Sequence, residues 1–124
     1  MGYTLTPQDL NGTLEEVAQV IGVPAAIMLA QRMGGARVYI PETSRQDHPI
    51  ALAIGFDNAK KLSEKFSREY LEIPSKSAFR KIRNKLICKL YIDGKTANVI
   101  APLFGLTRRQ VFNIVSEVKR HTIH

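Results

Sequence analysis

The sequence predicts a mainly α-helical protein with short β-strands, in which a duplicated helix-helix-strand region is followed by a C-terminal helix-turn-helix. Three observations lead to this fold class: dense helix start and stop residues, a pattern that recurs after 33 residues, and a strong segregation of positive charge along the 124-residue chain. This length is typical of one domain, roughly 100–200 residues, although two small regions are also compatible with it. We expect one region over residues 1–75 and a second over 76–124.

Two short helices are predicted near the N-terminus. Thr13 and Glu16 form a capping-box pattern, which predicts a helix at about 13–21, and Gly22 is placed to end it. The segment 24–33 begins with a proline and continues with good helix formers, so it predicts a second helix.

A strand follows these helices, and the whole order then repeats. Residues 36–40 alternate, are β-branched and precede a proline, which is typical of a strand. Two copies are fewer than the three or more that a solenoid needs, so we predict two packed copies, at about 13–41 and 46–74. Identical residues recur 33 positions apart: Ile21-Gly22 and Ile54-Gly55, Ala26 and Ala59, Leu29 and Leu62, Ile40-Pro41 and Ile73-Pro74.

Three helices are predicted after residue 74. Ser75 or Ser77 can cap the first, which Gly94 ends. A shorter helix over about 96–104 and a last helix over about 108–120 follow. The first of the three has an apolar face made by Phe79, Ile82, Leu86 and Leu90.

Positive charge is concentrated in the last two-fifths of the chain. Residues 1–75 carry 7 Lys/Arg against 9 Asp/Glu, a net charge of −2, whereas residues 76–124 carry 11 against 2, a net charge of +9. Such segregation is typical of a surface for a polyanion, either nucleic acid or an anionic membrane. No apolar run approaches the ~20 residues of a membrane-spanning helix, so we expect nucleic acid and no membrane.

Cysteine usage and the N-terminal residues indicate a cytoplasmic protein. The N-terminus lacks the positive and apolar regions of a secretory signal, and Cys88 has no cysteine partner in the chain.

One cysteine and three scattered histidines are too few for a zinc site. No nucleophile has a base at a spacing that favours catalysis. We therefore expect no metal, no other cofactor and no enzyme activity.

Residues 96–118 have the pattern of a helix-turn-helix. Such a unit needs a small residue where its helices cross, a glycine in the turn, and apolar residues that lock the helices together. Ala101 and Gly105 suit the first two roles, and Thr107 with Gln110 forms a capping-box pattern at the start of the second helix. The apolar partners are Ile100, Phe104, Leu106, Val111 and Ile114.

The outward face of the last helix carries side chains suited to DNA. Arginine pairs with guanine, asparagine pairs with adenine, and an exposed phenylalanine can pack on a thymine methyl group. The alternative is a solvated basic helix with its phenylalanine packed against Phe104. The predicted base-reading residues are Arg108, Arg109, Phe112, Asn113 and Ser116.

Phosphate contacts are expected where helix ends meet the DNA backbone. Arg80 and Arg83 either add to these contacts or only solvate their own helix. The predicted phosphate-binding residues are Lys95, Thr96, Thr107, Lys119 and Arg120.

Two segments carry a resemblance to a known family. The segments GGARVYIP at 34–41 and IPSKSAFRKIRNKLICKLYIDGKTANVIAPLFGLTRRQVFNIV at 73–115 resemble the Mor/C family of phage (Mu-like) middle and late transcription activators. The resemblance implies a homodimer with an N-terminal helical dimerisation region, strands from both subunits, and a helix-turn-helix in the major groove. It also implies recruitment of bacterial RNA polymerase. The chain departs from the family in its second copy, where Ser67-Arg68 replaces the pair Gly34-Gly35.

The sequence thus favours a double-stranded DNA-binding transcription regulator that activates phage or prophage promoters with bacterial RNA polymerase. A homodimer is also favoured because residues 1–75 are near neutral and duplicated, and because each chain has one helix-turn-helix. Its dimerisation strand would be Val38, Tyr39 and Ile40, paired with strand 70–73 or with a symmetry mate. The alternatives are a repressor, an architectural DNA-binding protein, or a helix-turn-helix that docks a protein.

Overall fold

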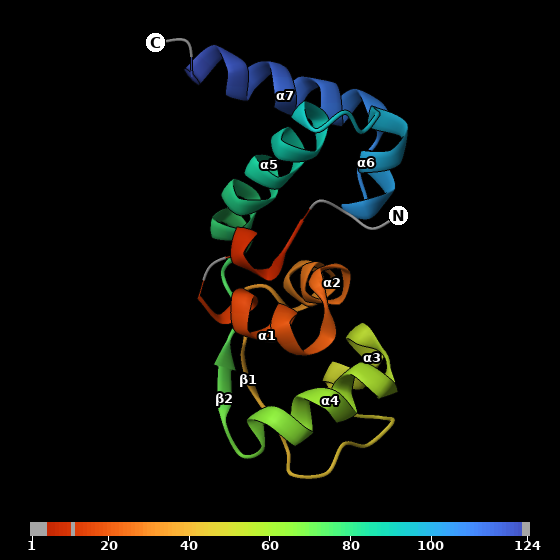
Figure 1. Cartoon of the computed structure of the whole chain (residues 1–124). Coiled ribbons are helices and arrows are strands. Elements are labelled where there is room, and N and C mark those ends of the chain that lie inside the picture. The colour runs from red at the N-terminus through yellow and green to blue at the C-terminus, as the bar shows by residue number, and fades with distance from the viewer. Residues whose placement is uncertain (1–4, 11, 123–124) are drawn as a thin grey trace. The chain divides into compact units, whose positions relative to one another are not determined.

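The computed structural model describes residues 5–10 and 12–122, with side chains described through residue 118 (Figure 1). The fold is mainly helical with one small two-stranded antiparallel sheet, as predicted. It divides into two compact units, one formed by residues 6–79 and the other by Leu5 with the chain from Arg80 onward. The division therefore falls inside a helix, four residues beyond the boundary expected from the sequence.

A short 3-10 helix η1 (Pro7–Asp9) precedes the first predicted copy, whose elements are α1 (Thr13–Ile21), α2 (Val23–Met33) and β1 (Arg37–Tyr39). Gly22 separates the two α-helices with a φ of 91°, a left-handed conformation that favours glycine. The predicted capping box at the start of α1 is wrong. Gly12 is the N-cap and makes no side-chain bond, and Thr13 is already the first helical residue, one position too late to cap.

Elements of the second copy are α3 (Pro49–Ile54), α4 (Phe56–Phe66) and β2 (Tyr70–Glu72). The bounds of α4 and β2 lie 33 residues after those of α2 and β1. Helix α3 is shorter than α1 because Pro49 begins it, and the Nδ1 atom of His48 accepts a hydrogen bond from the backbone N–H of Ile50 at 3.2 Å. Gly55 follows α3 with a φ of 91°.

Strands β1 and β2 pair with each other inside the chain (Figure 1). The register places Val38 opposite Leu71, and both side chains are buried. The sequence left two partners open for β1, and the structure selects the strand of the same chain. The outward face of this ribbon holds Arg37, Tyr39, Tyr70 and Glu72.

Four helices of the N-terminal unit pack against one another, each contacting two of the others. Helix α1 contacts α2 and α4, and α3 contacts α4 and α2. The Arg32 guanidinium ties α2 to α3 by donating a hydrogen bond from Nη1 to the carbonyl oxygen of Ala53 at 2.9 Å. Fully buried side chains at the centre of this unit are Leu10, Leu14, Val17, Leu29, Ile40 and Leu62.

Helices α5 (Lys76–Ile92), α6 (Ala97–Leu103) and α7 (Arg108–Thr122) follow. Ser75 caps α5, since its hydroxyl accepts a hydrogen bond from the backbone N–H of Ala78 at 3.1 Å. On the predicted apolar face, Ile82 is only half-buried, and Ile87 is fully buried although the pattern did not include it. The predicted face members that are buried are Phe79, Leu86 and Leu90.

Gly34 is predicted to be required for stability because a side chain there would crowd both the last turn of α2 and the chain after β2. A Cβ atom there would lie 2.8 Å from the carbonyl oxygen of Ala30 and 3.3 Å from both the Pro74 carbonyl oxygen and the Lys76 Cγ atom. Gly34→Ala should therefore lower the free energy of unfolding by about 1–3 kcal/mol, measured by urea denaturation. The matched control, Ser67→Ala at the corresponding position of the second copy, should change it by less than about 0.5 kcal/mol. Equal effects at the two positions would contradict this account of Gly34.

Candidate nucleic-acid interface

Helices α6 and α7 pack against each other across a short turn. Two of the predicted apolar positions, Leu106 and Ile114, are only half-buried. Val115 is buried as well, a position that the predicted apolar pattern did not include. Its place one helical turn after Val111 could have indicated it. The predicted positions that are buried are Ile100, Ala101, Phe104 and Val111.

The turn itself is built around Gly105. This residue has a φ of 66°, so the left-handed backbone explains the glycine. The N–H of Leu106 donates to the carbonyl oxygen of Ala101 at 2.9 Å and closes the end of α6. Pro102 lies in the last turn of α6 and is exposed. The helix ends at Leu103, so the hydrogen bond that proline removes is lost where the helix is already ending.

A capping box fixes the start of α7, as the sequence predicted. The backbone N–H of Gln110 donates to the Thr107 hydroxyl at 3.1 Å, and the Thr107 N–H donates to the Gln110 Oε1 atom at 2.8 Å. Thr96 caps α6 by a single bond, its hydroxyl accepting from the Val99 N–H at 3.3 Å. The first turns of both helices are therefore held by side chains from within the same unit.

The predicted base-reading residues lie on the exposed face of α7. Arg108, Arg109, Asn113 and Ser116 are all exposed. Buried Val111 and Val115 fix the opposite face of the helix. The orientation of α7 about its own axis is thus set by packing, and the polar side chains are free to contact a partner from solvent.

Phe112 is 38% exposed and takes part in a small aromatic cluster. Its ring meets that of Tyr91 edge-to-face, with the centroids 6.5 Å apart. The Arg108 guanidinium carbon lies 5.5 Å from the Phe112 ring centroid, a cation–π contact. The described ring partner of Phe112 is therefore Tyr91 of α5, where the alternative expected from the sequence was Phe104.

An open pocket of about 430 Å³ adjoins this cluster, and it contains two of the predicted phosphate-binding residues, Lys95 and Thr96. Lys95 is half-buried and Thr96 is exposed. Thr107 is exposed at the start of α7. Lys119 and Arg120, the other two predicted residues, have side chains outside the described part of the structure. The pocket is lined by Tyr91, Gly94, Lys95, Thr96, Ala97 and Phe112.

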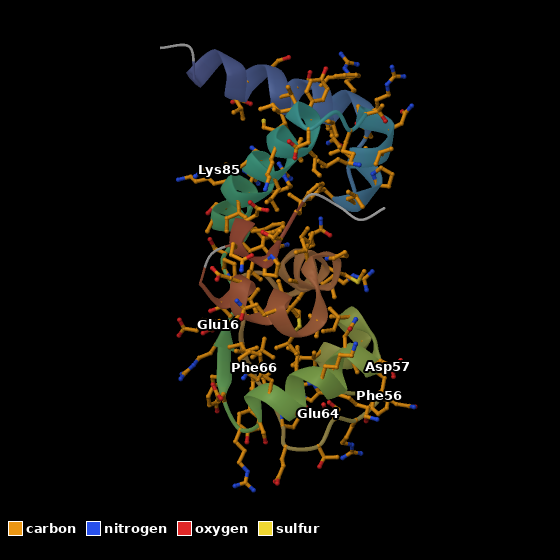
Figure 2. The ribbon with its side chains drawn as sticks, viewed as in Figure 1. Glu16, Phe56, Asp57, Glu64, Phe66 and Lys85 are labelled. Atoms are coloured by element: carbon orange, nitrogen blue, oxygen red, sulfur yellow. The ribbon has the colours of Figure 1, made fainter. Side chains whose placement is uncertain are left out.

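Arginines 80 and 83 on α5 have different surroundings. Arg80 is exposed, whereas Arg83 is half-buried and donates from Nε and Nη2 to the Asn84 Oδ1 atom at 3.1 and 2.9 Å. Burial, with a smaller effect from the nearby Arg80 charge, lowers the pKa of Arg83. Arg83 is thus engaged within its own helix. Lys85 projects away from the α5 ribbon into solvent (Figure 2).

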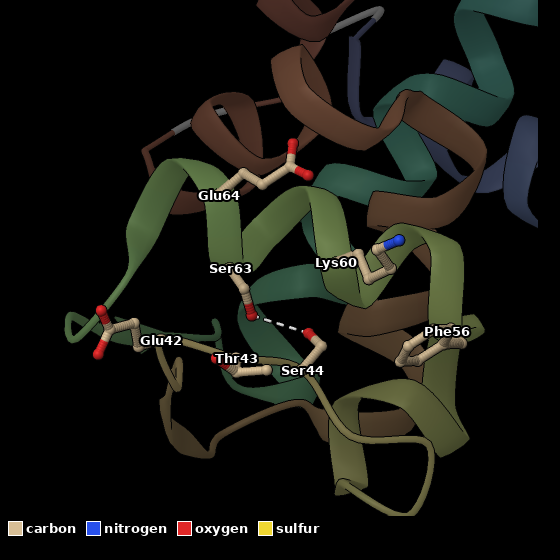
Figure 3. A pocket seen from close by; sticks show the side chains of 7 residues that line it. All are labelled: Glu42, Thr43, Ser44, Phe56, Lys60, Ser63 and Glu64. Atoms are coloured by element: carbon tan, nitrogen blue, oxygen red, sulfur yellow. Dashed lines mark hydrogen bonds between the residues drawn. The ribbon is translucent and has the colours of Figure 1, made fainter.

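The N-terminal unit contains a second hollow, of about 260 Å³, between α4 and the segment after β1 (Figure 3). The hydroxyl groups of Ser44 and Ser63 face each other in it at 2.8 Å and satisfy one another. Lys60 stands over the Phe56 ring, 5.7 Å from its centroid. Two pairs of wall side chains are therefore already engaged with each other, and the lining also includes Glu42 and Glu64.

The described residues contain no candidate metal site and no candidate membrane-spanning helix. Over 5–10 and 12–122, no group of three or more His, Cys, Asp or Glu side chains is placed to hold a metal ion. Within the same ranges, none of the helices combines the length and the apolar character needed to traverse a bilayer.

Comparisons of this chain with protein-family models, with curated proteins and with solved structures found no match. The resemblance to the Mor/C family therefore rests on the motif residues of the two segments described above.

Loss of the α7 capping box is predicted to destabilise the C-terminal unit. Thr107→Ala removes the hydroxyl that accepts from the Gln110 N–H, so it should lower the free energy of unfolding by about 1 kcal/mol. Thr107→Ser retains an acceptor at that position and should restore most of the loss. Thermal unfolding followed by circular dichroism measures both variants, and equal stability of the Ala and Ser variants would rule out the cap as the cause.

Proposed function

We propose that this protein is a sequence-specific regulator that binds double-stranded DNA through a helix-turn-helix formed by α6 and α7. One observation carries the proposal: Arg108, Arg109, Asn113 and Ser116 line the exposed face of α7, while buried valines hold the opposite face against the unit. A helix so held can place these side chains in a major groove, where arginine and asparagine distinguish guanine and adenine edges.

The charge of the C-terminal part supports a nucleic-acid partner. Residues 76–124 carry a net charge of +9, against −2 for residues 1–75. Arg80, Lys81 and Lys85 of α5 are also exposed and add positive charge to the same compact unit. Such charges release counterions from phosphates and supply affinity that does not depend on base sequence.

The regulatory output we propose is activation of phage or prophage promoters together with bacterial RNA polymerase, which follows from the Mor/C resemblance. A repressor or an architectural protein would use the same DNA-binding surface without touching polymerase. A protein-docking helix-turn-helix is the alternative of another class. A homodimer, expected from the sequence, would bring two recognition helices to one duplex, and it stands as the alternative to binding by a single chain.

Arg109→Ala is predicted to relax base preference at one position of the DNA site. Loss of a bidentate arginine contact should cost about 1–3 kcal/mol on the preferred sequence and little on sequences that lack the matching base. The measurement is selection of bound sites from random duplexes, followed by titration of the selected duplex and its single-base variants.

The matched control is Lys95→Ala, a proposed phosphate contact. This variant should weaken binding to every duplex by a similar factor and leave the ranking of sequences unchanged. If Arg109→Ala also weakens all duplexes alike, Arg109 does not read a base.

Salt dependence separates DNA binding from protein docking. With about four phosphates neutralised, the affinity for the selected duplex should fall roughly 100-fold between about 50 and 200 mM salt. Fluorescence anisotropy with labelled duplex measures this slope. An affinity that stays constant over this range would exclude a DNA interface built on the basic surface of the C-terminal unit.

A further inference from the structure

The two copies in the N-terminal unit have matching backbone hydrogen bonds at their helix junctions. The N–H of Gly22 donates to Ala18 at 2.8 Å, and that of Gly55 donates to Ala51 at the same distance. The glycine carbonyls then accept from Ala26 and Ala59, each at 3.1 Å. Helices α2 and α4 that follow are both 11 residues long. Two segments of different sequence therefore have the same local fold.

The strand register is also what a two-fold axis requires. Val38 and Leu71, which are 33 residues apart and so occupy the same place in the two copies, lie opposite each other. The flanking hydrogen bonds exchange accordingly: Ile40 N–H donates to the Glu69 carbonyl at 2.9 Å, and Ile73 N–H donates to the Ala36 carbonyl at 2.9 Å. Each bond becomes the other when the copies are swapped. The local axis thus passes between Val38 and Leu71.

The contacts between helices are also interchanged when the two copies are swapped. Helix α1 of the first copy packs on α4 of the second, and α3 of the second copy packs on α2 of the first. Residues at corresponding positions are buried in both copies, as shown by Ala26 and Ala59 and by Leu29 and Leu62. An interface in which each partner uses the same patch is the isologous contact of a two-fold dimer.

We infer that residues 13–74 are a two-fold unit completed by one chain, so that the protein engages DNA as a single chain, with one recognition helix on a site that lacks two-fold symmetry. The contacts described above support the internal two-fold unit, whereas the inference about DNA binding rests on the proposed function. Only the second copy leads into α5 and the proposed helix-turn-helix. One two-fold unit therefore carries one recognition helix.

Covalent linkage favours pairing within the chain over pairing with a second copy. Only residues 40–48 separate β1 from α3. A short linker gives its ends an effective concentration on the order of millimolar, which exceeds the micromolar concentration of a second chain by about a thousandfold. The ribbon is also short, and an ion pair of 2.7 Å between Arg68 and Glu42 lies beside it. Short strands with charged residues resist edge-to-edge association.

A cross-strand disulfide tests whether the strands pair within one chain. Tyr39 and Tyr70 are opposite each other on the exposed face of the ribbon, with ring centroids 5.1 Å apart. In a Cys88→Ser background, Tyr39→Cys with Tyr70→Cys should form a disulfide under mild oxidation. The product should run as a single chain of about 13.9 kDa on a non-reducing gel, and alkylation should find no free thiol in it. A crosslinked dimer, or no crosslink, would overturn the inference.

The control pair is Tyr39→Cys with Glu72→Cys in the same background. These residues share a face but are two positions out of register, a diagonal separation of about 7–8 Å that is too long for a disulfide without backbone movement. This variant should remain mostly reduced. Equal crosslinking of the two variants would show that the ribbon does not hold the register described here.

The molar mass of the unmodified chain tests how many copies of it assemble, both free and on DNA. Light scattering at micromolar concentration should give the mass of one chain, and native mass spectrometry should give one chain on the selected duplex. A two-chain particle in either measurement would overturn single-chain binding. If no duplex is bound at all, the proposed function fails, while the disulfide and the mass of the free chain still decide the internal two-fold unit.

Discussion

The pairing of β1 with β2 is the contact on which the N-terminal unit depends. Each strand has only three residues, and an isolated hairpin-sized ribbon is marginal in water. It persists here because Val38 and Leu71 turn inward and are buried within the same compact unit as helices α1 to α4. Ribbon and helices are therefore interdependent, since neither half can bury its apolar face without the other. Cooperative unfolding of residues 13–74 follows from this arrangement.

Local features of this fold were accessible from the sequence because short-range chemistry determines them. The glycine at 22, the capping box of Thr107 and Gln110, and the strand before Pro41 are all decided within a few residues. The cap of α1 was misassigned because Thr13 and Glu16 fit the capping pattern equally well if the helix starts one residue later. The partner of β1 could not be chosen, since a free strand edge accepts a neighbour from its own chain or from another.

The candidate interface was predictable in its residue types more than in its packing. Helical spacing indicated that Arg109 and Asn113 face outward, and both are exposed. The neighbour of Phe112 was not indicated, because Tyr91 lies 21 residues earlier on another helix. The aromatic contact and the guanidinium of Arg108 over the same ring restrict how far Phe112 can reach. A thymine methyl would therefore meet a ring that is already held on two sides.

The two predicted copies differ at corresponding positions, and such differences bear on whether the two-fold unit is built from one chain or from two. In a true homodimer every residue occupies both halves of the interface, so a change in one half is repeated in the other. Here Ile27 is buried, while Lys60 at the corresponding position is exposed beside the Ser44–Ser63 hollow. Gly34 is approached by the Pro74 carbonyl, where the chain leaves β2 for α5, and Ser67 takes its place in the second copy. The first copy thus has a glycine where the chain that continues into α5 passes closely, and the second copy has a serine at the corresponding position.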